Sequence, residues 1–149
     1  MDVVRVAARE KLGKVEKKLS GILFEKGIDS IGFALIRSKG DEALLGGYST
    51  IEMKKKLSIP TNRPLADFLP TLLIKAKDFA TELTSHNVLE KELLGETKIT
   101  NEHIDNNQAI RKILKERGIK PELLPAAEDV KKLKRKLENE KEKILKIKK

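Results

Sequence analysis

The sequence predicts an all-α protein, a small helical domain with a central antiparallel helix hairpin and amphipathic N- and C-terminal helices. Three observations support this fold class: apolar residues recur at steps of three and four, 37% of the 149 residues are charged, and only 3% are aromatic. Such a composition is typical of helices that each bury one narrow apolar face.

The N-terminal segment, residues 2–25, has a clear helical period. Its apolar positions are Val4, Ala8, Leu12, Val15, Leu19 and Ile22. Most of its Lys and Arg residues lie off this face, and Gly27 is a typical residue for the end of a helix. We therefore expect an amphipathic helix that ends before Gly27.

Residues 30–47 fit two patterns. Phe33 and Leu35 alternate with smaller residues as in a strand, whereas Phe33, Ile36 and Leu44 share a helical face. A two-stranded hairpin is marginal without a sheet to join, and no other segment resembles a strand. We favour a helix for this segment.

Ser49 begins the next predicted helix. Glu52 follows three residues later, which is the spacing of a capping box, and Tyr48 and Met53 are placed as a hydrophobic staple. The pattern predicts a short helix that ends near Leu57.

Three prolines then divide the chain. Pro60 and Pro64 indicate a turn, Pro64 suits the first position of a helix, and Pro70 breaks or kinks whatever precedes it. Residues 71–94 then predict a long helix. Its predicted apolar face is Leu72, Ala76, Phe79 and Leu83.

A second helix is predicted from Asn101 to Gly118. Thr100 is a suitable N-cap residue, and residues 95–99 form the predicted connection from the preceding long helix. Because this connection is short, the two helices are expected to pack as an antiparallel hairpin.

The chain is expected to divide into a helical domain, residues 1–125, and a basic C-terminal helical arm, residues 126–149. The arm has ten Lys/Arg and five Asp/Glu, so it carries +5 of the net charge of +9. Its apolar positions are Val130, Leu133, Leu137, Ile144 and Ile147, and the heptad fails at Glu140. This apolar face is expected to pack on the N-terminal helix, either within one chain or across a homodimer.

Several function classes lack their sequence signals. There is no Gly-rich phosphate loop, no Cys, and no apolar run near the ~20 residues that span a bilayer. His86 and His103 lack the spacing of a zinc helix. We predict a cytoplasmic protein that is not an enzyme and has no catalytic residue, cofactor, metal site or membrane partner.

Polar side chains interrupt the predicted hairpin. They are His86, Asn87, His103, Asn106 and Asn107. Antiparallel packing would place Asn87 roughly opposite Asn107, and bonded amides would fix the register of the two helices. A structural seam is the favoured interpretation, and a ligand or partner site is the alternative.

Two basic segments are candidates for weak, nonspecific nucleic-acid binding. Residues 49–69 have the outline of a helix-turn-helix, with Lys54, Lys55 and Arg63 as its basic residues. The second segment is the arm. Its candidate phosphate contacts are Lys132, Arg135 and Lys136. For the arm, a solvated face is the favoured single interpretation, and a phosphate-binding surface or an interaction helix are the alternatives.

Several blocks occur in an order that resembles the bacterial DNA-damage-inducible protein D family. They include Pro64-Leu-Ala-Asp-Phe-Leu-Pro70, His103-Ile-Asp-Asn-Asn107 and Arg117-Gly-Ile-Lys-Pro121. The resemblance covers the C-terminal half of full-length members, which also carry an N-terminal Bro-type domain. It implies a regulator of the SOS response that influences recombination through a protein partner, the strand-exchange recombinase filament on DNA.

Overall fold

The computed structural model describes residues 2–148, and every regular element in that range is helical. The all-α prediction is therefore confirmed. The elements, in chain order, are α1 (Asp2–Glu25), α2 (Ser30–Leu44), α3 (Thr50–Lys56), the 3₁₀ helix η1 (Leu65–Phe68), α4 (Thr71–Glu90), α5 (Glu96–Glu116), the 3₁₀ helix η2 (Pro121–Leu123) and α6 (Val130–Ile147).

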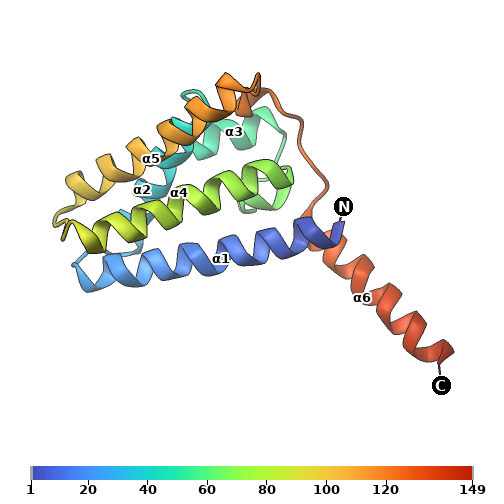
Figure 1. The fold of residues 1–149 in the computed structure, drawn as a ribbon. Helices are drawn as coiled ribbons and strands as arrows, with labels where there is room; N and C mark the ends of the chain where they lie inside the picture. The colour runs from blue at the N-terminus through green and yellow to red at the C-terminus, as the bar shows by residue number, and fades with distance from the viewer. Residues whose placement is uncertain (1, 149) are drawn as a thin grey trace.

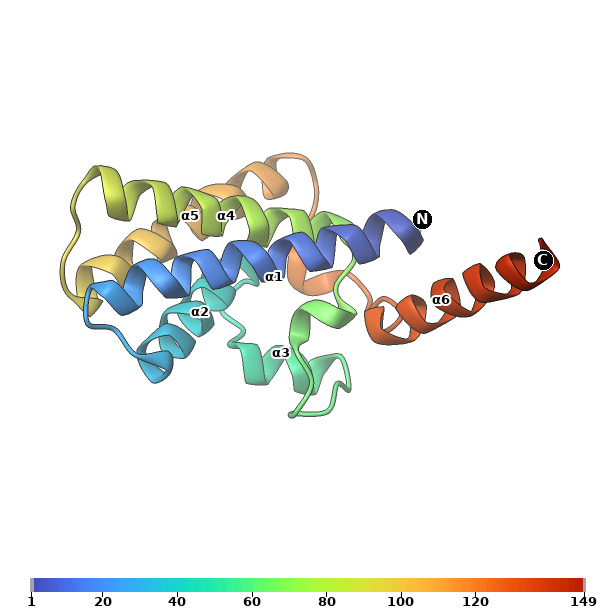
Figure 2. The same ribbon diagram turned by 90° about the horizontal axis from the view of Figure 1, so that it is seen from below.

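The long helices α1, α4 and α5 lie side by side, α4 and α5 run in opposite directions, and α2 packs against α5 (Figure 1). The short helix α3 lies to one side of this bundle, and α6 projects away from it near the N-terminus of α1 (Figure 2). The body of the protein is thus a helical bundle with one projecting helix.

Two apolar clusters form the bundle core. The larger one joins α1, α4 and α5 to the α3 and η1 segments around Leu12, Met53 and Leu73. The smaller one lies at the other end of α1 and includes Leu19 and Ile99. The fully buried members of both clusters are aliphatic, and the aromatic side chains Tyr48, Phe68 and Phe33 pack only against the edges of the clusters.

The sequence correctly predicted several local features. Residues 30–44 are helical, and the capping box is formed, with the Ser49 side chain accepting from the Glu52 amide and the Glu52 carboxylate accepting from the Ser49 amide. Met53 belongs to the larger apolar cluster, and Tyr48 is partly buried and packs against that cluster. These features depend on residues close together in the sequence, so the sequence pattern alone is enough to predict them.

Two predictions about the long helices are wrong. Helix α5 begins at Glu96 rather than Asn101, and Thr100 lies inside it, where its hydroxyl donates to the Glu96 carbonyl at 2.6 Å. In α4, Leu72 and Phe79 are exposed, whereas Leu73 and Ala80 are fully buried. The buried face of α4 is rotated from the predicted one because α1 and α5 cover it from two sides.

Candidate functional site

The base of the projecting helix is held by a buried arginine on α1. Arg5 donates from Nε to the Leu69 carbonyl at 2.9 Å and from Nη2 to the Asp67 carbonyl at 2.8 Å, at the end of η1. Its Nη1 donates to the carbonyl of Glu128, just before α6. One guanidinium group therefore joins α1, η1 and the start of α6 through three backbone oxygens.

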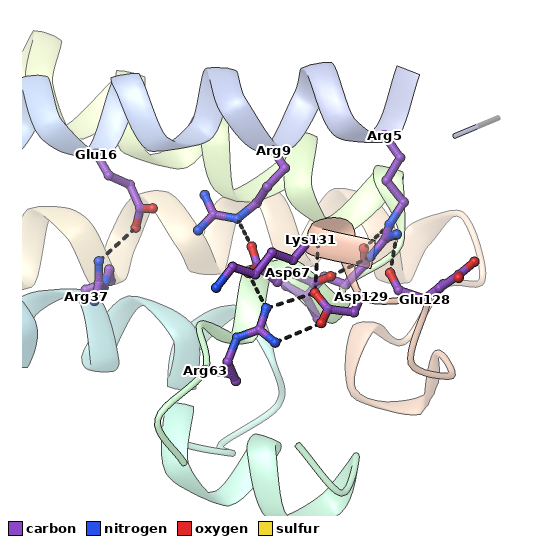
Figure 3. Close-up of polar contacts among 10 residues, drawn as sticks. Arg5, Arg9, Glu16, Arg37, Arg63, Asp67, Glu128, Asp129 and Lys131 are labelled. Atoms are coloured by element: carbon purple, nitrogen blue, oxygen red, sulfur yellow. Dashed lines mark hydrogen bonds and ion pairs between the residues drawn. The ribbon is translucent and has the colours of Figure 1, made fainter. Parts of the chain in front are cut away.

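Two further arginines share carboxylates beside Arg5 (Figure 3). Asp67 accepts from Arg9 Nε at 2.7 Å and from Arg63 Nη2 at 3.0 Å. Arg63 also binds both oxygens of Asp129, each at 2.8 Å. We call Arg5, Arg9, Arg63, Asp67 and Asp129 the arginine network, and it connects three segments far apart in the sequence.

Asp129 has a second role as the N-cap of α6. Its Oδ1 accepts from the Lys131 amide at 3.0 Å, and just before it the Ala127 amide donates to the Phe68 carbonyl at 2.8 Å. Hydrogen bonds from Arg63, followed by the Lys131 amide, hold the pKa of Asp129 below its ordinary value of 3.8. The carboxylate is therefore charged at neutral pH and fixes the first turn of α6.

A small apolar contact completes this anchor. Val130 and Leu133 of α6 pack with Val6 of α1, and Leu137 packs against their edge. The predicted contact between the first and last helices is therefore made within one chain. It involves Val6 rather than the middle of α1, because Leu12 and Leu19 belong to the bundle core.

Beyond Leu137, α6 leaves the bundle. Ile144, Leu145 and Ile147 are 54%, 53% and 84% exposed. Lysines surround these residues on α6 and are themselves exposed. The distal half of α6 is thus an amphipathic helix whose apolar side chains have no cover among the described residues.

The polar seam lies inside the bundle, between α4 and α5. Thr84 bonds His103 Nδ1 at 2.7 Å and accepts from Asn106 Nδ2 at 3.0 Å. Asn107 Nδ2 donates to the His103 carbonyl at 2.9 Å. Burial, with a smaller effect of Lys77, lowers the pKa of His103 from 6.5 to about 4, so this histidine is neutral at pH 7.

Two details of the predicted seam are wrong. His86 is exposed, so it is not part of the seam. Asn87 donates to Glu102 Oε2 at 3.0 Å rather than pairing with Asn107. The earlier start of α5 explains why Asn87 does not face Asn107. It changes which residues of the two antiparallel helices lie opposite each other.

A buried ion pair was missed by the sequence analysis. Lys77 Nζ of α4 lies 2.7 Å from Asp41 Oδ1 of α2, with side-chain exposures of 8% and 5%. The Thr50 hydroxyl donates to the other Asp41 oxygen at 2.6 Å. No local signal marks this pair, since Lys77 lies in a segment with other charged residues and its partner is 36 residues away.

The predicted helix-turn-helix is not formed. Helix α3 is followed by η1, which is a four-residue 3₁₀ helix, so no second α-helix is present to enter a DNA groove. Arg63 is held by two carboxylates. Lys54 donates to the Thr61 carbonyl at 3.1 Å, and Lys55 is exposed.

The predicted basic residues of the arm are all exposed on α6. Lys132 and Arg135 make no ion pair with another described residue, whereas Lys136 pairs with Glu128 at 3.0 Å. This hydrogen bond raises the pKa of Lys136. The arm therefore presents exposed positive charge at Lys132 and Arg135.

Two general findings apply to residues 2–148. No group of three or more His, Cys, Asp or Glu side chains converges in a way that could hold a metal ion. No helix in this range is both long enough and apolar enough to cross a membrane.

These features define a class of all-α module, in which a basic amphipathic helix is anchored at its base and projects from a helical bundle. The family model of the DinD C-terminal domain matches residues 1–133, so the chain belongs to the DinD family, and the resemblance noted in the sequence is confirmed. This membership gives the chain a DNA-damage-inducible context. None of the curated proteins compared with the chain matches it.

Proposed function

We propose that this chain is a non-enzymatic regulatory module of the bacterial DNA-damage response that modulates recombination. In this proposal the projecting helix α6 binds a protein partner near DNA, and the favoured partner is the strand-exchange recombinase filament. The observation that carries the proposal is the uncovered apolar side of α6, at Ile144 and Ile147, on a helix whose base is fixed by the arginine network. Membership of the DinD family supports the DNA-damage context.

The charge pattern of α6 supports an acidic protein partner. With Val130 at the first position of a heptad, the positions that flank the apolar seam are all lysines. These are Lys134, Lys136, Lys141, Lys143 and Lys148. In helix pairs such flanking positions select the partner by charge. A helix or groove with apolar centre and acidic edges would match this surface.

The same pattern disfavours pairing of α6 with a second copy of itself. In a self-paired coiled coil, flanking lysines of one helix would face flanking lysines of the other, and like charges at these positions destabilise the pair. Homo-oligomers formed through α6 are therefore not part of the proposal.

The experiment measures binding of the full chain to recombinase filaments on single-stranded DNA. The test variant is Ile144→Ser with Ile147→Ser, and the matched control is Ile113→Ser with Leu123→Ser, which removes two exposed apolar side chains elsewhere. We expect at least tenfold weaker binding for the α6 variant and no change for the control. Equal binding by all three proteins would contradict the proposal.

A second candidate function is weak, nonspecific DNA binding. It is supported by the exposed basic residues of the arm, including Lys132 and Arg135. Counterion release predicts that such affinity falls steeply with salt, with a log-log slope of about −0.9 for each duplex phosphate neutralised. Duplex affinity that equals filament affinity, with the same salt slope, would favour this function over the protein partner.

A further inference from the structure

A polar cleft of about 300 Å³ lies between α1, α2, α4 and the segment that joins α3 to η1. Five cationic side chains line it, which are Arg9, Arg37, Lys54, Arg63 and Lys77. Figure 3 shows Arg9 and Arg63 on one side and Arg37, beside Glu16, on the other. Helix α6 contributes no lining residue, so this cleft is separate from the surface used in the proposed function.

The five cations of the cleft outnumber the four carboxylates that contact them by one. Lys77 and Asp41 form a closed, buried pair and neutralise each other. Arg9 is paired with Asp67 at 2.7 Å, Arg37 with Glu16 at 3.5 Å, and Arg63 with both Asp129 and Asp67. Lys54 has no carboxylate within 4.0 Å in the part of the chain that the structure describes. An excess of positive charge therefore remains where the cleft opens.

Three of these side chains also carry N–H groups that have no short hydrogen bond to an acceptor among residues 2–148. Arg9 uses its Nε for Asp67 and has no partner for its two terminal nitrogens. Arg37 approaches Glu16 only at 3.5 Å, longer than the 2.7 to 2.8 Å of the closest arginine pairs in the network. Lys54 donates to one carbonyl, that of Thr61. Two guanidinium groups and one ammonium group thus present N–H donors to one cleft.

We propose that this cleft binds a phosphate group, either free or carried by a nucleotide or a nucleic-acid strand. A phosphate offers several acceptor oxygens and at least one negative charge, which matches converging arginine and lysine donors. Lys54 and Arg37 supply the principal contacts, because Lys54 has no carboxylate partner among the described residues and the pair of Arg37 with Glu16, at 3.5 Å, is the longest ion pair of the cleft.

The test is a titration of the full chain, with backbone amide signals followed by NMR at constant ionic strength. The probes are inorganic phosphate, a nucleoside 5′-monophosphate and a short single-stranded oligonucleotide. We expect saturable shifts at amides around Arg9, Arg37 and Lys54 with at least one probe. A larger affinity for inorganic phosphate identifies a free-phosphate site, and a larger affinity for the oligonucleotide identifies a strand-binding site.

The test variant is Arg37→Ala with Lys54→Ala, and it should bind the preferred probe at least tenfold more weakly. The matched control is Lys98→Ala with Lys112→Ala, which removes two exposed lysines of α5 and should bind as the wild type does. Thermal melts check that each protein is folded, and Lys54→Glu alone gives a second variant with the same expected loss. The proposal would be overturned if the test and control variants lost equal amounts of probe affinity, or if the amide shifts caused by the probe were confined to α6.

Discussion

Arg63 and Asp129 form a two-bond ion pair, with both nitrogen-to-oxygen distances at 2.8 Å, across 66 residues of sequence. The pair connects the loop before η1 to the first turn of α6. Arg63 hydrogen bonds lower the pKa of Asp129, so the pair contributes stability that is present at neutral pH and is lost as pH falls through this lowered pKa. Together with the Arg5 hydrogen bond to the Glu128 carbonyl and the packing on Val6, this contact holds the start of α6 against the bundle.

The first prediction concerns that anchor. Asp129→Ala removes both the partner of Arg63 and the N-cap of α6, so the segment before α6 should open more often. Hydrogen exchange of the Ala127 amide, which donates to the Phe68 carbonyl, should become at least tenfold faster. The control is Glu128→Ala, because the neighbouring Glu128 carboxylate only pairs with exposed Lys136. Unchanged exchange in Asp129→Ala would show that Arg5 and the apolar contact are sufficient.

The second prediction is a pH dependence of stability caused by His103. Burial lowers its pKa to about 4, a direction that Lys77 reinforces and Asp41 and Glu102 oppose. The unfolded chain takes up this proton near pH 6.5, so stability present above that pH is lost as pH falls toward 4. The loss corresponds to about 3 kcal/mol.

Urea unfolding between pH 7 and pH 4 measures this effect. His103→Gln should start from a lower stability and lose much less of it in that range. His86→Gln is the matched control, because it removes the exposed histidine and should keep the full decline. If the unfolding free energy of His103→Gln declined as much as that of the wild type, the pH dependence would come from other titratable groups.

The third prediction concerns the buried pair of Lys77 and Asp41. Lys77→Met leaves the Asp41 carboxylate buried with only the Thr50 hydroxyl as its partner, and this should cost about 3 to 5 kcal/mol of unfolding free energy. Adding Asp41→Leu removes the stranded charge and should recover part of that loss. A double variant that is less stable than Lys77→Met would show that packing, rather than the unpaired charge, causes the loss.

The fourth prediction tests the tight contact between α2 and α5. A side-chain carbon added at Gly40 would lie 2.5 Å from the His103 ring and 2.9 Å from Asn107 Nδ2. Gly40→Ala should therefore destabilise the protein by about 1 to 3 kcal/mol. Gly21→Ala, in α1 with no neighbouring atom within 4 Å, should instead stabilise it by up to about 1 kcal/mol. Chemical unfolding of both variants compares the two, and a neutral Gly40→Ala would mean that His103 can shift.

The sequence predicts those parts of the fold whose causes are local. The capping box of Ser49 and Glu52 and the helix break at Pro70 depend on neighbouring residues, and both are found. The buried face of α4 could not be predicted in the same way. Two neighbouring helices cover it, so its buried region is wider than one apolar stripe and includes polar Thr84 and charged Lys77.

The candidate site was less predictable than the fold, because its contacts are distant in sequence. Arg63 was noticed as a basic residue, but nothing near it indicates that Asp129 holds it. Thr100 has the residue type of an N-cap, yet the helix begins earlier, after Gly95 in a positive-φ conformation. The exposed basic side of α6 was predictable because it depends only on composition and period.

If the projecting part of α6 binds the partner, a chain that ends after Leu137 should lose that binding. This truncation keeps Asp129, Val130, Leu133 and Leu137, so the arginine network and the packing on Val6 remain. Its affinity for recombinase filaments on single-stranded DNA is compared with that of the full chain at the same salt concentration. Binding should be at least tenfold weaker for the truncated chain, and an unchanged affinity would place the partner surface on the helical bundle instead of on α6.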